Sequence, residues 1–490
     1  MNYILAIPVF LPILSGLALL FIKFKDREDV HAYAIITLAI SLVATVISNF
    51  ILMSNELVVF KLPMGLTFTL YTDAVAAFFS TIFAVVWFLV AIYSFEYLKH
   101  EGKEKRFFAF YLMTLGWLVG VAYADNPFTL YMCFEAMTFS SFALVLHSQT
   151  AKSIAAAKNY IYFSVFGAFM GLIGIFYFYS WDAIETKSFV SGGVIPHELG
   201  GMMPMVMLVT FIAIIGFSCK SGMFPLHAWL PIAHPEAPAP ASSVLSGLIT
   251  KSGIIAIIRI VFFVVGADVL RGTYVQKILL VLSIITIFMG SMMAYKEKVL
   301  KKRLAYSSVS QISYVIFGIM LLSGVGAMGA ILQVAFHALA KNTLFLCAGA
   351  IIYKTQKTEC SQLNGLGRGM PKTFAAFTIA GLSLVGVPLT GGFVSKYYLA
   401  NAALGADEKL LGFIGVCVLM VSALLTGGYL LTISAKALFA KADEEVMVNC
   451  EPNSLMLAPI WTLTAFIVFF GIFPQPLIVL AQAVVTSFGL

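Results

Sequence analysis

The stretch GFSCKSGMFPLHAWLPIAHPEAPAPASS (residues 216–243) decides the fold, because it places polar and helix-breaking residues between two long apolar runs. Lys220 and Gly222 end the first run, and Pro225 and Pro231 follow before the second run begins. Proline lacks a backbone N–H and interrupts a helix. Within a membrane, non-helical backbone is tolerated only inside protein or along a water-filled cavity. If the flanking runs span a bilayer, this stretch therefore predicts a broken helix that lines an ion path.

The composition of the whole chain places those runs in a membrane. Of its 490 residues, 61 % are hydrophobic and 11 % are charged, whereas soluble domains carry about 25 % charged residues. We therefore predict an all-α polytopic membrane protein that contacts the lipid bilayer. The net charge of +7 then reports on orientation in the membrane, and no nucleic-acid partner is expected.

Apolar runs of spanning length predict about fourteen transmembrane helices. The first run is expected to remain as a span, because it has no preceding basic residue and no cleavage site of the A-x-A type. After the second run, residues 54–72 alternate in polarity and are rich in β-branched side chains, which predicts an external hairpin. The runs lie near residues 3–22, 32–53, 74–93, 107–124, 127–147, 159–180, 202–223, 241–265, 274–294, 304–323, 327–352, 373–398, 409–435 and 455–475.

Lysine and arginine residues are concentrated in alternate loops, which predicts the orientation. By the positive-inside rule these loops face the cytoplasm, so both termini lie outside it. The opposite loops hold few basic residues: Lys61, Lys187, Arg271, Lys277 and Lys409. The basic loops lie near residues 23–27, 99–106, 152–158, 296–303, 354–372 and 436–441.

Cofactor and metal motifs are missing from the sequence. The six cysteines are scattered, with no CxxC pair and no metal-ligand spacing. No GxGxxG or Walker A pattern is present. We therefore expect no metal site and no cofactor in this chain, and any redox chemistry would belong to partners.

Several ionisable residues lie inside the predicted spans, where each charge costs about 2.5–3.5 kcal/mol on insertion scales. Such residues are functional candidates by default. Alternatives remain open: Arg259 and Lys396 would reach an interface, Glu135 would be a hydrogen-bonded core carboxyl, and His227 and His234 would be loop histidines. The intramembrane candidates are Glu135, Lys220, Lys251, Arg259, Lys341 and Lys396.

His337 and Lys341 form an H-x-x-x-K pair in FHALAKNTLF. Residues four apart share one face of a helix. A histidine titrates near neutrality, so the pair suits a proton relay. The alternative is a hydrogen-bonded core histidine.

A second interruption resembles the first. GLSLVGVPLTGGFVSKYYL (381–399) carries Pro388, Gly391 and Gly392 before Lys396. Lys220 and Lys396 are 176 residues apart. The same offset carries the predicted helix 127–147 onto residues 303–323, which overlap the next predicted helix at 304–323. It also places Gln311 opposite Glu135.

This spacing predicts two inverted five-helix repeats, each with a broken helix. Residues 107–265 form the first repeat and residues 274–436 the second. Three helices in residues 1–100 precede them, and a C-terminal helix in residues 455–490 follows.

The sequence resembles the antiporter-like subunits of the complex I superfamily. The resemblance rests on FEAM, CKSGMFPLHAWLPIAHPEAPAPASSVLSGLITKSGIIAIIR, FHALAKNTLFL and GGFVSK. That family includes proton-pumping membrane subunits of NADH:quinone oxidoreductase, the A and D subunits of Mrp sodium/proton antiporters, and subunits of membrane-bound hydrogenases. The LHAWLPIAHPEAPAP segment is similar to the Mrp D and hydrogenase-associated types.

The resemblance implies a role for each motif residue. Glu135 is similar to the family's glutamate on helix five, Lys220 to its partner lysine on the broken helix seven, and Lys251 to the central lysine on helix eight. His337 and Lys341 resemble the helix-eleven relay. Lys396 matches the terminal residue of the broken helix twelve, where some relatives have glutamate.

The resemblance also implies partners and a location. Other membrane subunits, further antiporter-like subunits among them, and a peripheral redox arm are expected. The expected location is the inner (plasma) membrane of a prokaryote. The sequence leaves open which complex is meant, whether it is an oxidoreductase or an Mrp antiporter, and which electron donor it uses.

The resulting hypothesis is ion movement in the membrane midplane. Protons, or protons exchanged for sodium, would pass from the Glu135–Lys220 pair to Lys251, then Lys341, then Lys396. An isolated buried ion pair costs several kcal/mol to separate, so its separation would act as a switch. The alternative is a membrane scaffold that anchors a redox arm without an ion path of its own.

Overall fold

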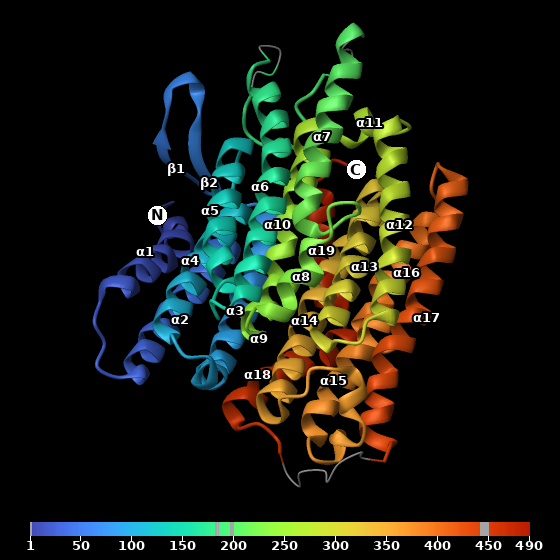
Figure 1. The fold of residues 1–490 in the computed structure, drawn as a ribbon. Helices are drawn as coiled ribbons and strands as arrows, with labels where there is room; N and C mark the ends of the chain where they lie inside the picture. The colour runs from blue at the N-terminus through green and yellow to red at the C-terminus, as the bar shows by residue number, and fades with distance from the viewer. Residues whose placement is uncertain (1, 182–183, 185, 197–199, 442–449) are drawn as a thin grey trace.

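The computed structural model describes residues 2–181, 184, 186–196, 200–441 and 450–490, and it is a bundle of helices that run along one common direction (Figure 1). Twelve helices within the described residues are long and apolar enough to cross a membrane. Helices satisfy their own backbone hydrogen bonds, so they can span lipid. The chain is therefore an all-α, multi-pass membrane protein, as predicted.

The N-terminal part carries a hairpin at one end of the bundle (Figure 1). Its two strands pair antiparallel, with Glu56 opposite Tyr71. The inner strand rests on the helices, because Thr69 N–H donates to the Thr129 hydroxyl at 2.9 Å. The elements of this part are α1 (Ile7–Phe21), α2 (Arg27–Phe50), β1 (Glu56–Lys61), β2 (Thr67–Tyr71) and α3 (Ala74–Glu101).

The middle part contains the first helix break, between α7 and α8. The segment Ala239–Val265, which contains α9 and α10, is a continuous but irregular helix. Two π-helical stretches, Leu245–Ile249 and Arg259–Val265, interrupt its α geometry. The elements are α4 (Glu104–Tyr123), α5 (Pro127–Val145), α6 (Ala151–Tyr179), α7 (Met203–Ser221), α8 (Trp229–Glu236), α9 (Ala239–Val244), α10 (Thr250–Ile258) and α11 (Ala267–Leu270).

The C-terminal part contains the second break, between α15 and α16. Its longest helix, α14, has 32 residues and lies at the centre of the bundle, with almost every side chain buried. The elements are α12 (Tyr274–Lys296), α13 (Leu300–Met320), α14 (Gly324–Thr355), α15 (Pro371–Val385), α16 (Gly391–Leu404), α17 (Lys409–Phe439), α18 (Ser454–Ile472) and α19 (Gln475–Thr486).

Two predicted spans are not among the twelve. The span predicted over 304–323 is the helix α13, whose first turn holds Lys301, Lys302 and Arg303. The span predicted over 373–398 consists of two shorter helices, α15 and α16. The count of fourteen therefore stays a prediction.

The offset of 176 residues does not superpose the two helix breaks. Lys220 lies before its break, which begins at Gly222 with φ 78°. Lys396 lies after its break, which begins at Gly386 with φ 87°. The two left-handed glycines are the matching positions, because both end a half-helix in the conformation that only glycine adopts without strain. The same offset carries α5 (Pro127–Val145) onto residues 303–321, close to α13 (Leu300–Met320), so it fits these helices but not the breaks. The inverted repeats themselves stay a prediction.

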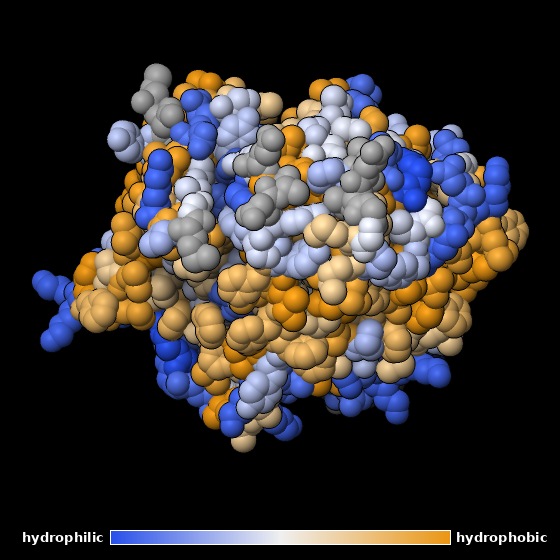
Figure 2. Space-filling view, turned by 90° about the horizontal axis from the view of Figure 1, so that it is seen from above, coloured by the Kyte–Doolittle hydropathy of each residue, from blue (hydrophilic) through white to orange (hydrophobic). Residues whose placement is uncertain are grey.

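Burial separates the helices into a centre and an outer ring. The segment Ala239–Val265 is fully buried, whereas α2, α6, α17 and α18 expose many apolar side chains. Figure 2 looks onto the end of the bundle that carries the hairpin, and it shows hydrophilic and hydrophobic residues side by side there. An apolar outer ring suits contact with lipid, and it leaves the centre for the polar residues.

His147, in the turn after α5, is expected to make the stability of the protein depend on pH. His147 donates from Nε2 to Gly102 O at 3.0 Å, and its carbonyl accepts from the Arg106 guanidinium. Burial lowers the pKa of His147 from 6.5 to about 4, and the Arg106 and Lys103 charges lower it further against that hydrogen bond. The unfolded chain therefore binds a proton at a higher pH than the folded one. Stability is complete above the unfolded pKa and is lost as pH falls towards 4.

We expect this loss to be at most about 3 kcal/mol. His147→Gln keeps a donor for Gly102 O but does not titrate, so its stability should fall less steeply between pH 6.5 and pH 4. The measurement is the thermal unfolding midpoint of both proteins in detergent over that range. Parallel curves for the two proteins would contradict the assignment.

Candidate functional site

A line of polar and ionisable side chains runs through the centre of the bundle. Lys220, Lys251, His337 and Lys341 are each at most 1 % exposed, while Glu135 and Lys396 are half-buried. They come from α5, α7, α10, α14 and α16, so segments far apart in the sequence meet here. All six were predicted as candidates from the sequence.

Lys220 lies in a cage of hydroxyl groups. Its Nζ donates to Thr138 Oγ1 at 2.9 Å, to Tyr160 Oη at 2.7 Å and to Ser164 Oγ at 3.2 Å. The ammonium also lies 4.4 Å from the centre of the Tyr160 ring. An ammonium has three protons to donate, so the cage satisfies it with neutral acceptors alone.

Glu135 lies one helical turn from Thr138 on α5, but it forms no ion pair with Lys220 in the described part of the chain. The two groups are close enough to interact electrostatically. The buried Glu135 Oε1 has no hydrogen-bond partner among the described residues. The predicted pair is therefore present as electrostatic neighbours, while three hydroxyl groups take the hydrogen bonds of the lysine.

The first helix break lies directly after this lysine. Gly222 ends α7, and a Cβ added there would come within 2.1 Å of Leu230 Cδ1, so only glycine fits. Pro225 and His227 lie in the connection to α8. His227 is half-buried and stacks on Phe224, with ring centroids 5.9 Å apart. Among the described residues, it hydrogen-bonds none of the buried lysines.

Lys251 and His337 are in direct contact at the centre of the bundle. Lys251 Nζ lies 2.7 Å from His337 Nδ1, which joins α10 to α14. Lys251 Nζ also donates to Ser246 O at 2.9 Å, inside the π-helical stretch that precedes α10. Such stretches are frequent at functional sites, because they free backbone carbonyls for other donors. A charged lysine can only donate, so Nδ1 accepts in that state and the two groups can share one proton.

Two buried amides, Gln311 and Gln333, belong to the polar line between His337 and Lys396. Gln333 lies one turn before His337 on α14 and donates to Gln311 Oε1 at 2.9 Å. Ser395 Oγ donates to Gln333 Oε1 at 2.6 Å, next to Lys396. Lys341 lies one turn beyond His337 in the other direction. Its Nζ donates to Leu304 O at 2.9 Å. We call this arm of the polar line, from Lys341 towards Lys301, the side branch. The predicted order of Lys251, Lys341 and Lys396 stays a prediction.

Lys396 closes the second helix break. Its Nζ donates to the carbonyls of Leu384 and Val385, at the C-terminal end of α15. The C-terminal end of a helix carries partial negative charge, which favours a cation. The predicted alternative, in which Lys396 reaches the membrane interface, is therefore wrong.

Glycines allow the second break to close tightly. A Cβ on Gly392 would come within 1.7 Å of Ser383 O, and one on Gly391 within 2.0 Å of Phe336 Cδ1. Pro388 lies in the connection between α15 and α16. The start of α16 is thus pressed against the end of α15, which brings Lys396 to the free carbonyls.

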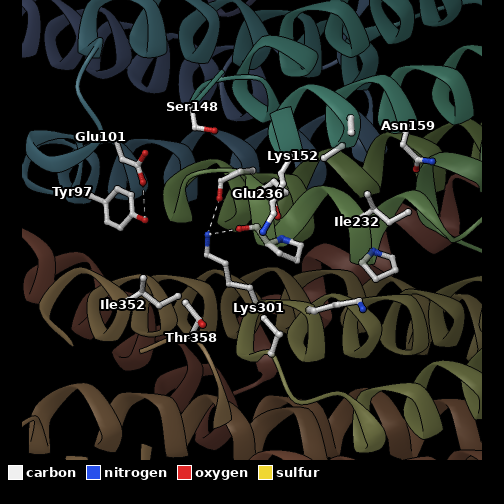
Figure 3. A pocket seen from close by; sticks show the side chains of 17 residues that line it. Tyr97, Glu101, Ser148, Lys152, Asn159, Ile232, Glu236, Lys301, Ile352 and Thr358 are labelled. Carbon is white, nitrogen blue, oxygen red and sulfur yellow. Dashed lines mark hydrogen bonds between the residues drawn. The ribbon is translucent and has the colours of Figure 1, made fainter. Parts of the chain in front are cut away.

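A cavity of about 940 Å³ leads towards the side branch from the end of the bundle that holds the basic loops. Figure 3 shows Lys301 extending between Glu101 and Glu236, with Lys152 and Asn159 nearby. Lys301 Nζ donates two hydrogen bonds to backbone carbonyls, to Ala237 O at 2.7 Å and to Pro235 O at 3.4 Å. The lysine is 7 % exposed, so its charge is largely buried behind the cavity.

His234 lies near Lys301, which lines this cavity, and near Lys341 of the side branch. It is fully buried, and neither ring nitrogen has a hydrogen-bond partner among the described residues. It lies within electrostatic range of both Lys301 and Lys341. The loop histidine considered from the sequence is thus a core histidine between two buried lysines.

Arg259 is outside this line. It is 2 % exposed and binds Asp73 through two bonds, of 2.5 and 3.0 Å. Its guanidinium also packs over the Phe263 ring at 4.8 Å. Asp73 caps α3 at the base of the hairpin, so this pair joins the hairpin region to the central segment. Arg259 thus reaches the end of the span α3 with a carboxylate partner there, and its predicted extension towards the interface stays a prediction.

Sequence reasoning missed the neutral partners in the site. Thr138, Tyr160 and Ser164 around Lys220 are ordinary residues in apolar helices, and Gln333 has no motif around it. Lys301 was assigned to a cytoplasmic loop because it stands beside Lys302 and Arg303. Helical spacing could have identified two of them, because residues three or four apart share one helix face. Thr138 follows Glu135 by three residues, and Gln333 precedes His337 by four.

Family models match most of the chain. Residues 124–423 match the family described as NADH:quinone oxidoreductase/Mrp antiporter, TM. Residues 62–108 match the family described as NADH-Ubiquinone oxidoreductase (complex I), chain 5 N-terminus. The first match contains the whole line of residues from Glu135 to Lys396.

Curated relatives agree with these matches. The N subunit of the NADH-quinone oxidoreductase of Desulforudis audaxviator is 31 % identical over 401 residues, which are 79 % of this chain and 78 % of the relative. The D subunit of the Na(+)/H(+) antiporter of Alkalihalophilus pseudofirmus is 26 % identical over 483 residues, covering 97 % of this chain and 95 % of the relative.

A solved structure with a similar fold is that of the membrane-bound sulfane sulfur reductase, an archaeal respiratory membrane complex. One of its chains superposes with a TM-score of 0.85 at 22 % identity, covering 99 % of this chain and 97 % of that one. The broken helices, the buried lysines and these matches lead to one conclusion: the chain belongs to the family of membrane subunits shared by NADH:quinone oxidoreductases and Mrp antiporters.

Proposed function

We propose that this chain translocates ions, protons or protons in exchange for sodium, as one membrane subunit of a multisubunit complex. The observation that carries the proposal is the contact of 2.7 Å between Lys251 and His337. It lies at the centre of a buried polar line from Glu135 to Lys396. Intramembrane ionisable groups that face the protein interior mark ion pathways and proton relays.

Lys220 and Glu135 supply the switch in this proposal. In the structure Lys220 is held by three neutral hydroxyls, and Glu135 stands nearby without an ion pair to a described residue. Approach of the carboxylate favours the charged lysine, and separation favours release of its proton. Because separating a buried pair costs several kcal/mol, a signal from a neighbouring subunit can control the step.

Access to the line is proposed through the side branch. The cavity beside Glu101 and Glu236 reaches Lys301, and His234 stands between Lys301 and Lys341. Lys341 lies one turn from His337 on α14. This branch offers protons a route from the end of the bundle to the central Lys251–His337 pair.

The complex and its membrane are also part of the proposal. Relatives named for NADH-quinone oxidoreductase and for a sodium/proton antiporter support partners that are further antiporter-like subunits, together with a peripheral redox arm in some complexes. We propose that this chain binds no cofactor and that redox chemistry belongs to such an arm. The bacterial relatives support a prokaryotic plasma (inner) membrane. The basic loops support an orientation with both termini outside the cytoplasm.

Glu135→Gln tests the function. The variant keeps the shape of the side chain but removes its charge, so the switch at Lys220 is lost. We expect the initial rate of ion translocation to fall about tenfold, a typical size for one lost coupling interaction. The measurement uses inverted vesicles that contain the whole complex, with dyes for pH and for sodium. The two dyes also identify the ion that moves.

The control is Glu28→Gln, an exposed residue at the start of α2 with the same charge change. Both variants should assemble to the same level as the wild type. If Glu135→Gln translocates ions at the rate of the control, the chain is a scaffold and the ion path lies in another subunit.

A further inference from the structure

A second cavity, of about 480 Å³, lies away from the ion path at the same end of the bundle. It is formed by the end of α12, the start of α13, residues 359–361 and the last turns of α17. Three cations line it: Lys298, Arg303 and Lys436. Neither the polar line nor its side branch uses any of these residues.

The positive charge of this cavity is largely uncompensated. Arg303 donates to the backbone carbonyls of Glu297 and Tyr429, and within the described ranges it has no carboxylate partner at ion-pair distance. The Glu297 carboxylate pairs with Lys302 at 3.0 Å instead. Lys298 and Lys436 are exposed and form no ion pair with a described residue.

One acid lines the cavity, but it is engaged elsewhere. The Glu359 carboxylate caps the short helical turn Cys360–Leu363 and accepts from Ser361 Oγ at 3.4 Å. The cavity therefore presents three cations against one capped carboxylate. Such a site favours an anion, and lysines bind phosphate groups as point charges.

Two apolar stripes lead from the membrane-spanning part of the bundle to this cavity. Exposed side chains recur at spacings of three, four or seven residues, so each set forms one helix face. Tyr295 ends the first stripe, and its ring lies over Gly428 of α17, where an added Cβ would be 3.1 Å from a ring carbon. The stripes are Ile278, Val281, Ile285, Phe288 and Tyr295 on α12, and Leu410, Phe413, Met420 and Leu424 on α17.

The stripe on α17 continues into Thr432 and Lys436, which line the cavity. In Figure 1, α17 lies at the right-hand edge of the bundle, and α12 packs against it. A bound molecule could therefore contact both the apolar faces of α12 and α17 and the cationic cavity at the end of these helices. A freely dissolved anion would use only the second of these.

We propose that this cavity binds the phosphate headgroup of an anionic phospholipid, whose acyl chains lie along the exposed faces of α12 and α17. Basic pockets between membrane helices on the cytoplasmic side bind such headgroups. A volume of about 480 Å³ is in the range of small-molecule sites. Tyr295 stands at the boundary, with its ring on the apolar side and its hydroxyl available to the headgroup region.

Native mass spectrometry of the intact protein tests the proposal. The protein is delipidated in a mild detergent and titrated with phosphatidylglycerol or with phosphatidylcholine. The pocket variant carries Lys298→Gln and Lys436→Gln, and the control carries Lys296→Gln and Lys441→Gln, two exposed lysines at the same end that do not line the cavity. Inorganic phosphate is added as a competitor in a separate titration.

We expect the wild type and the control to bind phosphatidylglycerol in preference to phosphatidylcholine. The pocket variant should bind phosphatidylglycerol on the order of 30-fold more weakly, because each cation near an anionic headgroup contributes about 1 kcal/mol. Millimolar phosphate should not displace the lipid. Equal affinity of the two double variants would overturn the proposal, and so would displacement by phosphate, since the site would then hold a free anion.

Discussion

Lys220→Met is expected to abolish ion translocation while the complex still assembles. The variant keeps the length of the side chain but removes the proton that Lys220 holds in its cage of hydroxyls. A positioned group that transfers a proton contributes about 100-fold or more to a rate. The measurement is the initial rate of pH and sodium gradient formation in inverted vesicles, together with the electron-transfer rate wherever the partner complex has one.

The cage itself is expected to survive this change. Thr138 still donates to Phe134 O at 2.9 Å, and Tyr160 still shares a hydrogen bond of 2.5 Å with Ser141. Few buried polar atoms are therefore left unsatisfied, so a loss of transport is not a loss of folding. Lys61→Met, on the exposed hairpin strand, is the control. A normal gradient in Lys220→Met would exclude Lys220 from the path.

The second large effect is expected at the contact between Lys251 and His337. Lys251→Met removes the ammonium that touches His337 Nδ1, and His337→Ala removes the acceptor. If the two groups pass one proton between them, either change interrupts the same step. Each single variant should then reduce translocation about 100-fold. The double variant should be no worse than either single variant, because groups that act as a unit are not additive.

The double variant therefore provides the decisive comparison. Two independent contributions would multiply, and the double variant would be about 10,000-fold slower, a result that contradicts a shared proton. Lys277→Met is the matched control, since this lysine forms an ion pair of 3.0 Å with Glu408 at the surface. Assembly is checked by size-exclusion chromatography of each variant.

Much of the fold was readable from composition and periodicity. Long apolar runs identified the spans, and proline and glycine after Lys220 and before Lys396 identified the two helix breaks. The cost of burying a charge singled out the six ionisable candidates. These inferences depend on one residue at a time and on its near neighbours, so no tertiary contact was needed to make them.

Predictions of which residues far apart in the sequence lie together were less accurate. The spacing of the two lysines gave an offset of 176, but Lys220 precedes its break and Lys396 follows its own. The ion pair of Arg259 with Asp73 was not predicted, because the two residues are distant in the sequence and no local pattern connects them. Lys301 looked like one of three loop cations, although it lies buried behind a cavity.

The sequence by itself determined that this protein spans a membrane, where its helices break, and which charges are too costly to bury for packing alone. Only the tertiary structure decided that Lys251 meets His337, that Lys220 is held by three hydroxyls without an ion pair to Glu135, and that Lys301 and His234 are buried. The reason is physical. Burial costs and helix breaking act locally along the chain, whereas a proton moves only between atoms within hydrogen-bond reach, and packing of distant helices sets those distances.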